Sequence, residues 1–250
     1  MGKHIEKKFN KKKIFLNILI AIFVIVLIIS IIYIVKWILD NRANQKITDK
    51  VEKKIINTSK NGEIEYIVDF KELKEINKQV VGWLKVKGTE IEYPVVQAKD
   101  NNYYLKRNLE KNYNVGGWIF ADYKNKFDGT DKNIVIYGHN MKDNSMFGSL
   151  KNILNEEWYN NEENYIVDFT TEQEQMKYQV FSIYKIENED YYINTEFKNN
   201  DFKTFIDTIE KRSVKEFDIE VSENDSILTL STCADNNKYR VVLHAKKISN

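Results

Sequence analysis

A cysteine, an arginine and a histidine are the residues of this sequence whose chemistry and placement suit attack on a carbonyl group. Cys233 is the only cysteine among the 250 residues, and it ends an apolar, strand-like run that begins at Ile227. With no second cysteine, it forms no internal disulfide and anchors no cysteine-based metal cluster. It is therefore either a buried structural thiol or a nucleophile. Its place at the end of a strand favours the nucleophile.

Arg240 opens the next apolar run, which continues to Ala245. The short loop between the two runs predicts a hairpin that brings Arg240 beside Cys233. A cysteine thiol has an ordinary pKa of ~8.5, so a nearby cation is needed to favour the thiolate near neutral pH. A guanidinium keeps its charge and offers a planar set of donors, which suits it to a thiolate, a substrate carbonyl or an oxyanion.

His139 ends a third strand-like run, which begins at Asn133, far upstream of Cys233. A histidine at a strand end can point out of a barrel mouth, and the alternative is a solvated loop histidine. His244 shares strand parity with Arg240 but lies four residues further along, or ~13 Å at ~3.3 Å per residue. That distance is too great to serve the same atom, so we interpret His244 as structural.

The elements that must position these residues are mostly strands. Strand-like segments lie at 83–86, 91–96, 116–120, 133–137, 178–186, 227–232 and 239–248. Helical stretches are expected at 145–154 and at 201–212. This order predicts a mainly β protein, one closed or nearly closed barrel with helical insertions.

Two of the expected helices have an apolar face that we assign to core packing alone. The helix at 201–212 carries Phe202, Phe205, Ile206 and Ile209 at helical spacing. A third helix is expected after an N-cap at Asp69, with Phe70, Leu73, Ile76 and Val80 on one face.

The N-terminus predicts a membrane anchor. Residues 14–35 form an apolar run that spans ~33 Å as a helix, enough to cross a hydrocarbon core of ~30 Å. A cleaved signal peptide is the alternative, but its apolar region is shorter and ends in small residues. A lysine cluster within residues 1–13 favours a cytoplasmic N-terminus. We expect a basic cytoplasmic tail at 1–13, a transmembrane anchor at 14–39, an extracellular stalk at 40–64 and a catalytic domain at 65–250.

Composition and charge give no sign of other partners. The net charge is +1, from 38 Lys and Arg against 37 Asp and Glu, so no global field points to nucleic acid. No glycine-rich phosphate loop follows a strand, and no spacing of His, Asp and Cys suits zinc or calcium. We therefore expect no nucleic-acid partner, no metal and no cofactor.

Several motifs resemble those of sortases, the membrane-anchored cysteine transpeptidases of Gram-positive bacteria. The run 228–233 followed by Arg240 is similar to the sortase T-L-x-T-C…R signature. Residues 137–142 and 146–150 resemble the histidine motif of class B, and 91–97 and 100–105 also match class B usage. A helix at 201–212, inside the long interval between His139 and Cys233, favours class B over class A. The resemblance covers about residues 65–248.

The resemblance implies the eight-stranded sortase barrel and a transpeptidation in two steps. Cys233 is expected to attack the threonine carbonyl of a sorting signal of the N-P-x-T-[N/G] kind. His139 protonates the leaving amine and later deprotonates the incoming one, while Arg240 holds the oxyanion or the signal backbone. Positions that match the class B substrate groove are Asn101, Leu105, Tyr192, Ile193 and Ser231.

The implied partners are surface proteins that bear sorting signals, an amine of the peptidoglycan precursor or cross-bridge, and membrane lipid around the N-terminal helix. The thioester conserves the energy of the acyl bond, so no nucleotide is needed. Ala234 departs from class B members that have a polar residue there. Asp235 could be taken for the acid of a catalytic triad, and we favour loop capping for it. Two other readings stay open at this point: a cell-wall L,D-transpeptidase, and a membrane-tethered scaffold or adhesion domain without activity.

Overall fold

The computed structural model describes residues 11–53, 55–60, 63–187, 189–198, 201–234 and 238–248, without the side chains of residues 11, 55–60, 63–66, 233 and 234. The chain divides into two compact units, residues 1–43 and residues 44–250, and each is considered by itself. The predicted loop-capping residue Asp235 lies outside the described residues.

Eight strands in the described part of the second unit close into a barrel in the order β10-β8-β7-β3-β4-β5-β6-β9. This confirms the predicted mainly β fold. The strands are β3 (Val80–Val86), β4 (Glu92–Val96), β5 (Phe120–Ala121), β6 (Asn133–Gly138), β7 (Ile166–Thr170), β8 (Gln175–Glu187), β9 (Ile227–Ala234) and β10 (Tyr239–Ile248).

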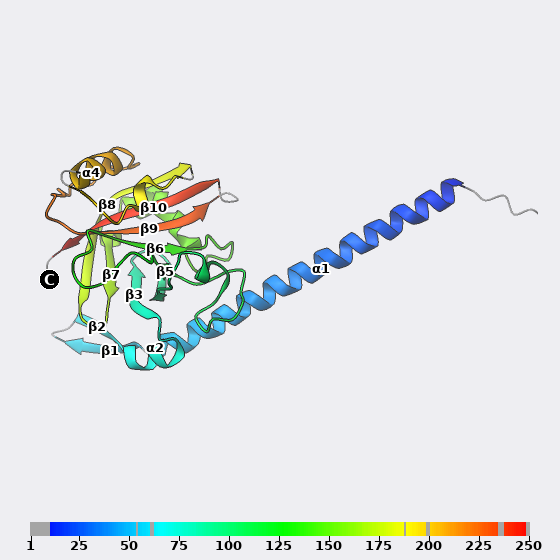
Figure 1. Ribbon diagram of the computed structural model, residues 1–250, viewed down its shortest axis with the longest axis horizontal. Helices are drawn as coiled ribbons and strands as arrows, with labels where there is room; N and C mark the ends of the chain where they lie inside the picture. The colour runs from blue at the N-terminus through cyan, green and yellow to red at the C-terminus, as the bar shows by residue number, and fades with distance from the viewer. Residues whose placement is uncertain are drawn as a thin grey trace, which may run out of the picture. The chain divides into compact units, whose positions relative to one another are not determined.

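The parallel pairing of β6 with β9 brings the carboxyl ends of these two strands to one rim of the barrel. Their register places Tyr137 opposite Ser231 and Gly138 opposite Thr232, and the two ribbons run side by side in Figure 1. Parallel strands end at the same edge of a sheet. The residues that follow, His139 on one strand and Cys233 on the other, therefore reach the same rim of the barrel.

A helix explains why the second half of β8 is buried on both faces. From Gln175 to Tyr178 exposed and buried residues alternate, whereas Val180 to Tyr184 are all buried. The change occurs where α4 (Asp201–Lys211) covers the outer face of the barrel beside β8 (Figure 1). The helix buries Phe202, Phe205, Ile206 and Ile209 there, as predicted.

The remaining elements connect the strands. They are the hairpin strands β1 (Ile55–Lys60) and β2 (Glu63–Val68), the helices α2 (Phe70–Ile76) and α3 (Glu156–Tyr159), and the 3₁₀ turns η1 (Tyr103–Lys106), η2 (Gly148–Leu154), η3 (Glu162–Tyr165) and η4 (Tyr191–Ile193).

Three sequence-based boundaries are wrong. The helix after Asp69 ends at Ile76, and Val80 instead begins β3. The segment 116–120 contributes only its last residue to a strand, because Gly117 turns the chain with a φ of 58°. The helix expected at 145–154 is a 3₁₀ segment that begins at Gly148.

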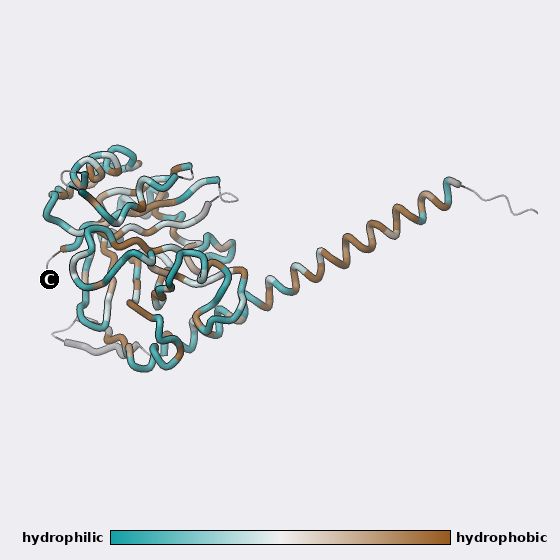
Figure 2. The backbone as a smooth tube through the Cα atoms, in the orientation of Figure 1, coloured by the Kyte–Doolittle hydropathy of each residue, from teal (hydrophilic) through white to brown (hydrophobic). Residues whose placement is uncertain are grey.

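The helix α1 (Lys11–Glu52) contains the candidate membrane span. Its apolar residues between 14 and 35 are exposed, and Figure 2 shows this stretch as a run of hydrophobic turns. The last turns of α1 belong to the second unit, where Ile47 and Val51 are buried in the main core.

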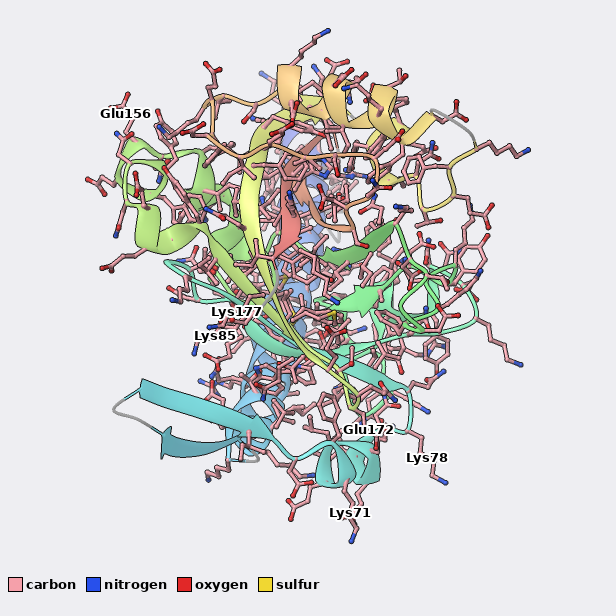
Figure 3. All side chains as sticks on the ribbon, turned by 90° about the vertical axis from the view of Figure 1, so that its left-hand side faces the viewer. Lys71, Lys78, Lys85, Glu156, Glu172 and Lys177 are labelled. Atoms are coloured by element: carbon pink, nitrogen blue, oxygen red, sulfur yellow. The ribbon has the colours of Figure 1, made fainter. Side chains whose placement is uncertain are left out.

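A ladder of charges on β3, β7 and β8 lies on a different part of the barrel from the β6–β9 edge. Asp168 pairs with Lys85 on one side and with Lys177 on the other, and Figure 3 shows these two lysines close together. Burial raises the pKa of the Asp168 carboxyl, and the two lysines oppose that shift. Opposite charges thus face one another across the strands of this wall, which does not line the pocket described below.

Candidate active site

A pocket of about 390 Å³ opens at the barrel rim where β6 and β9 end. Its lining comes from five regions of the sequence: η1 and the two residues before it, β5, the end of β6, the β8–α4 connection and the β9–β10 hairpin. The lining residues are Asn101, Asn102, Leu105, Phe120, Tyr137, Gly138, His139, Glu189, Asp190, Tyr192, Ile193, Ser231, Thr232 and Arg240.

The ring of His139 is held by a backbone carbonyl. Nε2 lies 2.7 Å from the carbonyl oxygen of Leu105, and the side chain is half-buried. A carbonyl oxygen only accepts, so this contact requires the proton on Nε2 and leaves Nδ1 as the second nitrogen. Backbone contacts hold the residue as well, because its carbonyl accepts hydrogen bonds from the amides of Met141 and Phe147.

Two glycines allow the chain to pack closely around this histidine. A Cβ on Gly117 would lie 2.5 Å from the Tyr104 carbonyl oxygen and 3.0 Å from the His139 ring. A Cβ on Gly138 would lie 2.5 Å from Ile119 and 2.6 Å from Phe147. Side chains at these positions would push the η1 carbonyls or the β6 end out of place.

The hairpin of β9 and β10 places the backbone of Cys233 directly opposite Arg240. The side chain of Arg240 is half-buried and lines the pocket. His139 and Arg240 therefore share one cavity, next to the strand position of Cys233. The side chain of Cys233 lies outside the described residues, and its role as nucleophile stays a prediction.

All five residues predicted to contact substrate line this pocket, namely Asn101, Leu105, Tyr192, Ile193 and Ser231. Two of them are bonded to each other, since the Tyr192 hydroxyl lies 2.9 Å from the Ser231 hydroxyl. Tyr192 and Ile193 form part of η4, in the connection that leads to α4.

Sequence reasoning missed several residues of the pocket and its support. Phe120 and Tyr137 belong to the wall, where their rings pack 5.2 Å apart. Glu189 also lines it and is paired with Arg212, which follows α4, at 2.5 Å. Tyr137 lies two residues before His139, so strand parity alone places both on one face.

His244, in contrast, is fully buried beneath α4. Its Nδ1 lies 2.8 Å from the Thr229 hydroxyl and its Nε2 lies 2.8 Å from the Tyr184 hydroxyl. Burial, reinforced by the charge of Arg212, lowers the pKa of His244 to about 3. These contacts agree with the structural role expected from its distance to Arg240.

The sortase domain family matches residues 84–248. Sortase B of Listeria monocytogenes is 37% identical over 223 residues, which are 84% of this chain and 87% of the relative. Sortase B of Staphylococcus aureus is 34% identical over 95% of this chain and 98% of the relative. The chain belongs to the sortase family, class B. It is a sortase-type cysteine transpeptidase, and the L,D-transpeptidase and scaffold readings are set aside.

Solved structures of class B sortases share the fold. The Staphylococcus aureus sortase B–substrate complex is 38% identical and has a TM-score of 0.67, covering 72% of this chain and 84% of that chain. The Bacillus anthracis sortase B in complex with AAEK1 is 34% identical with a TM-score of 0.74, covering 85% of this chain and 100% of that chain. The barrel and its rim are thus those of a sortase.

Proposed function

We propose that this sortase cleaves a sorting signal of the N-P-x-T-[N/G] kind after its threonine and transfers the attached surface protein to an amine of the cell-wall peptidoglycan. The observation that carries the proposal is the shared pocket. His139 and Arg240 line one cavity with five groove residues, beside the strand position of Cys233.

In the first step the Cys233 thiolate attacks the threonine carbonyl carbon. A carbon–sulfur bond forms, and the tetrahedral intermediate collapses with cleavage of the carbon–nitrogen bond. The departing amine takes a proton from His139, which acts as general acid. Because Nε2 is engaged with the Leu105 carbonyl, Nδ1 is the nitrogen suited to this transfer.

In the second step a peptidoglycan amine attacks the thioester. His139 accepts the proton that the amine loses, a carbon–nitrogen bond forms, and Cys233 leaves as thiolate. Arg240 stabilises the oxyanion in both steps through its fixed planar donors. One peptide bond is broken and one is made, so the reaction needs no external energy source.

For the location of the enzyme, we propose the domain boundaries given by the sequence. Residues 1–13 form a cytoplasmic basic tail, 14–39 cross the membrane, 40–64 are an extracellular stalk and 65–250 are the catalytic domain, with the difference that the stalk from Asn44 onward, including the buried Ile47 and Val51, folds in the same unit as the barrel. The exposed apolar surface of α1 between residues 14 and 35 supports the membrane anchor. An extracellular domain is required if the acceptor is the cell wall.

The test is cleavage of fluorescent peptides by the full chain in detergent micelles, with N-P-x-T-N and L-P-x-T-G sequences compared. We expect cleavage of the first peptide after threonine, and formation of an amide product when an amine nucleophile is added. Cys233→Ala should be inactive. Equal signals from the wild type and Cys233→Ala on every peptide would refute the proposed reaction.

A further inference from the structure

Asp122 is a buried carboxylate behind the pocket wall. It follows β5, is 4% exposed and does not line the cavity itself. Its Oδ2 accepts hydrogen bonds from the Asn101 Nδ2 and from the Tyr137 hydroxyl, each at 2.8 Å. Its Oδ1 accepts from the backbone amide of Lys124 at 2.9 Å. In the described part of the chain these three donors, and no ion pair, stabilise the charge.

This arrangement sets the direction of each hydrogen bond. An ionised carboxylate only accepts, so the Tyr137 hydroxyl hydrogen and one Asn101 amide hydrogen point to Asp122. The Asn101 Oδ1 is also occupied, because it accepts from the amide of Tyr123 at 3.0 Å. Burial and the charge of Asp122 raise the pKa of Tyr137 far above its ordinary value, which keeps the phenol protonated.

Among the residues that the structure describes, two groups of the wall then remain for a ligand. The Tyr137 oxygen has lone pairs and no hydrogen to give, so it can only accept. Asn101 has one amide hydrogen left, so it can only donate. A side-chain hydroxyl satisfies both, because it donates to Tyr137 and accepts from Asn101, whereas a methyl group satisfies neither.

The position of this pair indicates which substrate residue it meets. Tyr137 faces Ser231 in register, and residues 139 and 233 follow two positions later on the same strands. Residues two apart on a strand lie on one face, ~7 Å from each other. Asn101 and Tyr137 also line the same pocket as His139 and Arg240, so the inference places the threonine before the scissile bond against this pair.

We propose that Asp122 is a positioning residue that fixes Asn101 as donor and Tyr137 as acceptor, and thereby selects a hydroxyl-bearing residue at the cleaved bond. The proposal rests on the proposed function, because it assumes that the pocket binds the sorting signal. It assigns to Asp122 a role in specificity that requires no contact with the substrate.

Asp122→Asn tests these hydrogen-bond directions, because it replaces a carboxylate that only accepts with an amide of almost the same shape. The new amide must still accept from the Lys124 amide, so its NH₂ group faces Tyr137 and Asn101, which are both donors. The Tyr137 hydroxyl then accepts from residue 122 and turns its hydrogen into the pocket. Asp128→Asn is the matched control, because Asp128 is exposed and does not line this pocket.

The assay uses the full chain in detergent micelles and two peptides, N-P-x-T-N and its valine analogue N-P-x-V-N. The wild type and Asp128→Asn should prefer threonine by about tenfold or more in kcat/KM. Asp122→Asn should lose most of that preference, chiefly through a higher KM for the threonine peptide. In the double variant Asn101→Asp with Asp122→Asn, the residue 122 amide donates to the residue 101 carboxylate. The melting temperature lost in Asp122→Asn should therefore be recovered, but the preference for threonine over valine should not.

Binding to Cys233→Ala variants separates this inference from the proposed function. If the wild type cleaves neither peptide, the proposed function fails. Tighter binding of threonine over valine, lost with Asp122→Asn, would still support Asp122. A folded Asp122→Asn enzyme with wild-type KM and preference would refute the inference. If Asp122→Asn does not fold, Tyr137→Phe carries the test, and retained threonine preference in that variant would overturn it.

Discussion

The two histidines of the barrel occupy regions that use the same side chain in opposite ways. His139 lies at the rim, half-buried and bonded to one backbone carbonyl, in a pocket that also contains Arg240. His244 lies under α4, fully buried, with both ring nitrogens bonded to hydroxyls. Within the described residues, the rim histidine keeps one ring nitrogen for chemistry, and the buried histidine has both nitrogens bonded.

The polar groups around the two histidines also differ in how completely they are hydrogen-bonded. Around His244 the polar groups satisfy one another, since Thr229 donates to the Asn133 side chain at 2.7 Å while contacting the imidazole. Around the pocket, as far as the structure describes it, Asp122 leaves Tyr137 and Asn101 each with one hydrogen-bonding position unused. A closed network stabilises the fold, and an incomplete one is ready for a ligand.

The largest effect on activity is expected from removing the imidazole of His139. His139→Ala should lower kcat/KM for the sorting-signal peptide by about 10²–10⁴-fold, because a general acid is lost. Its melting temperature should stay near that of the wild type, since among the described residues the ring makes a single hydrogen bond. Peptide cleavage and thermal unfolding measure both, and near-wild-type turnover would contradict the role of His139.

The next effect concerns the cation of the rim. Arg240→Lys should lower kcat/KM by about 10²-fold, because a point charge does not replace a planar fork of donors. Arg42→Lys, an exposed position outside the pocket, is the control and should behave as the wild type. Full activity of Arg240→Lys would contradict the proposal that Arg240 stabilises the oxyanion.

His244→Ala should show the reverse pattern to His139→Ala. The loss of two buried hydrogen bonds and the resulting cavity should cost about 2–4 kcal/mol of the free energy of unfolding. For the protein that remains folded, kcat/KM should change less than about threefold. Urea unfolding and peptide cleavage provide the two numbers. A stable but inactive variant would mean that the two regions are not separate.

The smallest effect is a pH dependence of stability. The pKa of His244 is lowered to about 3 in the native state, against an ordinary value of ~6.5 in the unfolded chain. Below pH 6.5 the unfolded chain therefore binds a proton that the native state does not. Protonation of the unfolded chain at this residue should lower the stability by at most ~1.4 kcal/mol per pH unit, or about 2 kcal/mol in all as the pH falls from 6.5 to 5. His244→Gln should show a shallower slope between pH 6.5 and 5, and an equal slope would exclude this cause.

The strands around the site could be predicted because their apolar patterns are local. The segment predicted at 239–248 is β10 itself, and the prediction that a hairpin joins Cys233 and Arg240 agrees with the register. By contrast, β7 was not predicted, because Asp168 interrupts its apolar pattern. That charge is tolerated through its neighbours Lys85 and Lys177 on adjacent strands, which sequence alone does not bring together.

Elements that depend on distant contacts escaped prediction. The expected helical face at Val80 failed because Asn77 ends α2, where its side chain bonds the Tyr104 hydroxyl and the Leu109 carbonyl, each at 2.8 Å. Asp122 carries no sequence signal either, because its partners Asn101 and Tyr137 become neighbours only in the closed barrel. The motifs could be predicted, and the groups that orient them could not.

The covalent intermediate is the most direct test of the account, because it requires the sulfur, the imidazole and the guanidinium to act on one carbonyl. The full chain is mixed with the N-P-x-T-N peptide, quenched in acid during turnover and measured by intact-protein mass spectrometry. We predict an adduct equal to the peptide up to its threonine, located on Cys233 and absent from Cys233→Ala. Turnover without that adduct, or an adduct on another residue, would contradict the mechanism.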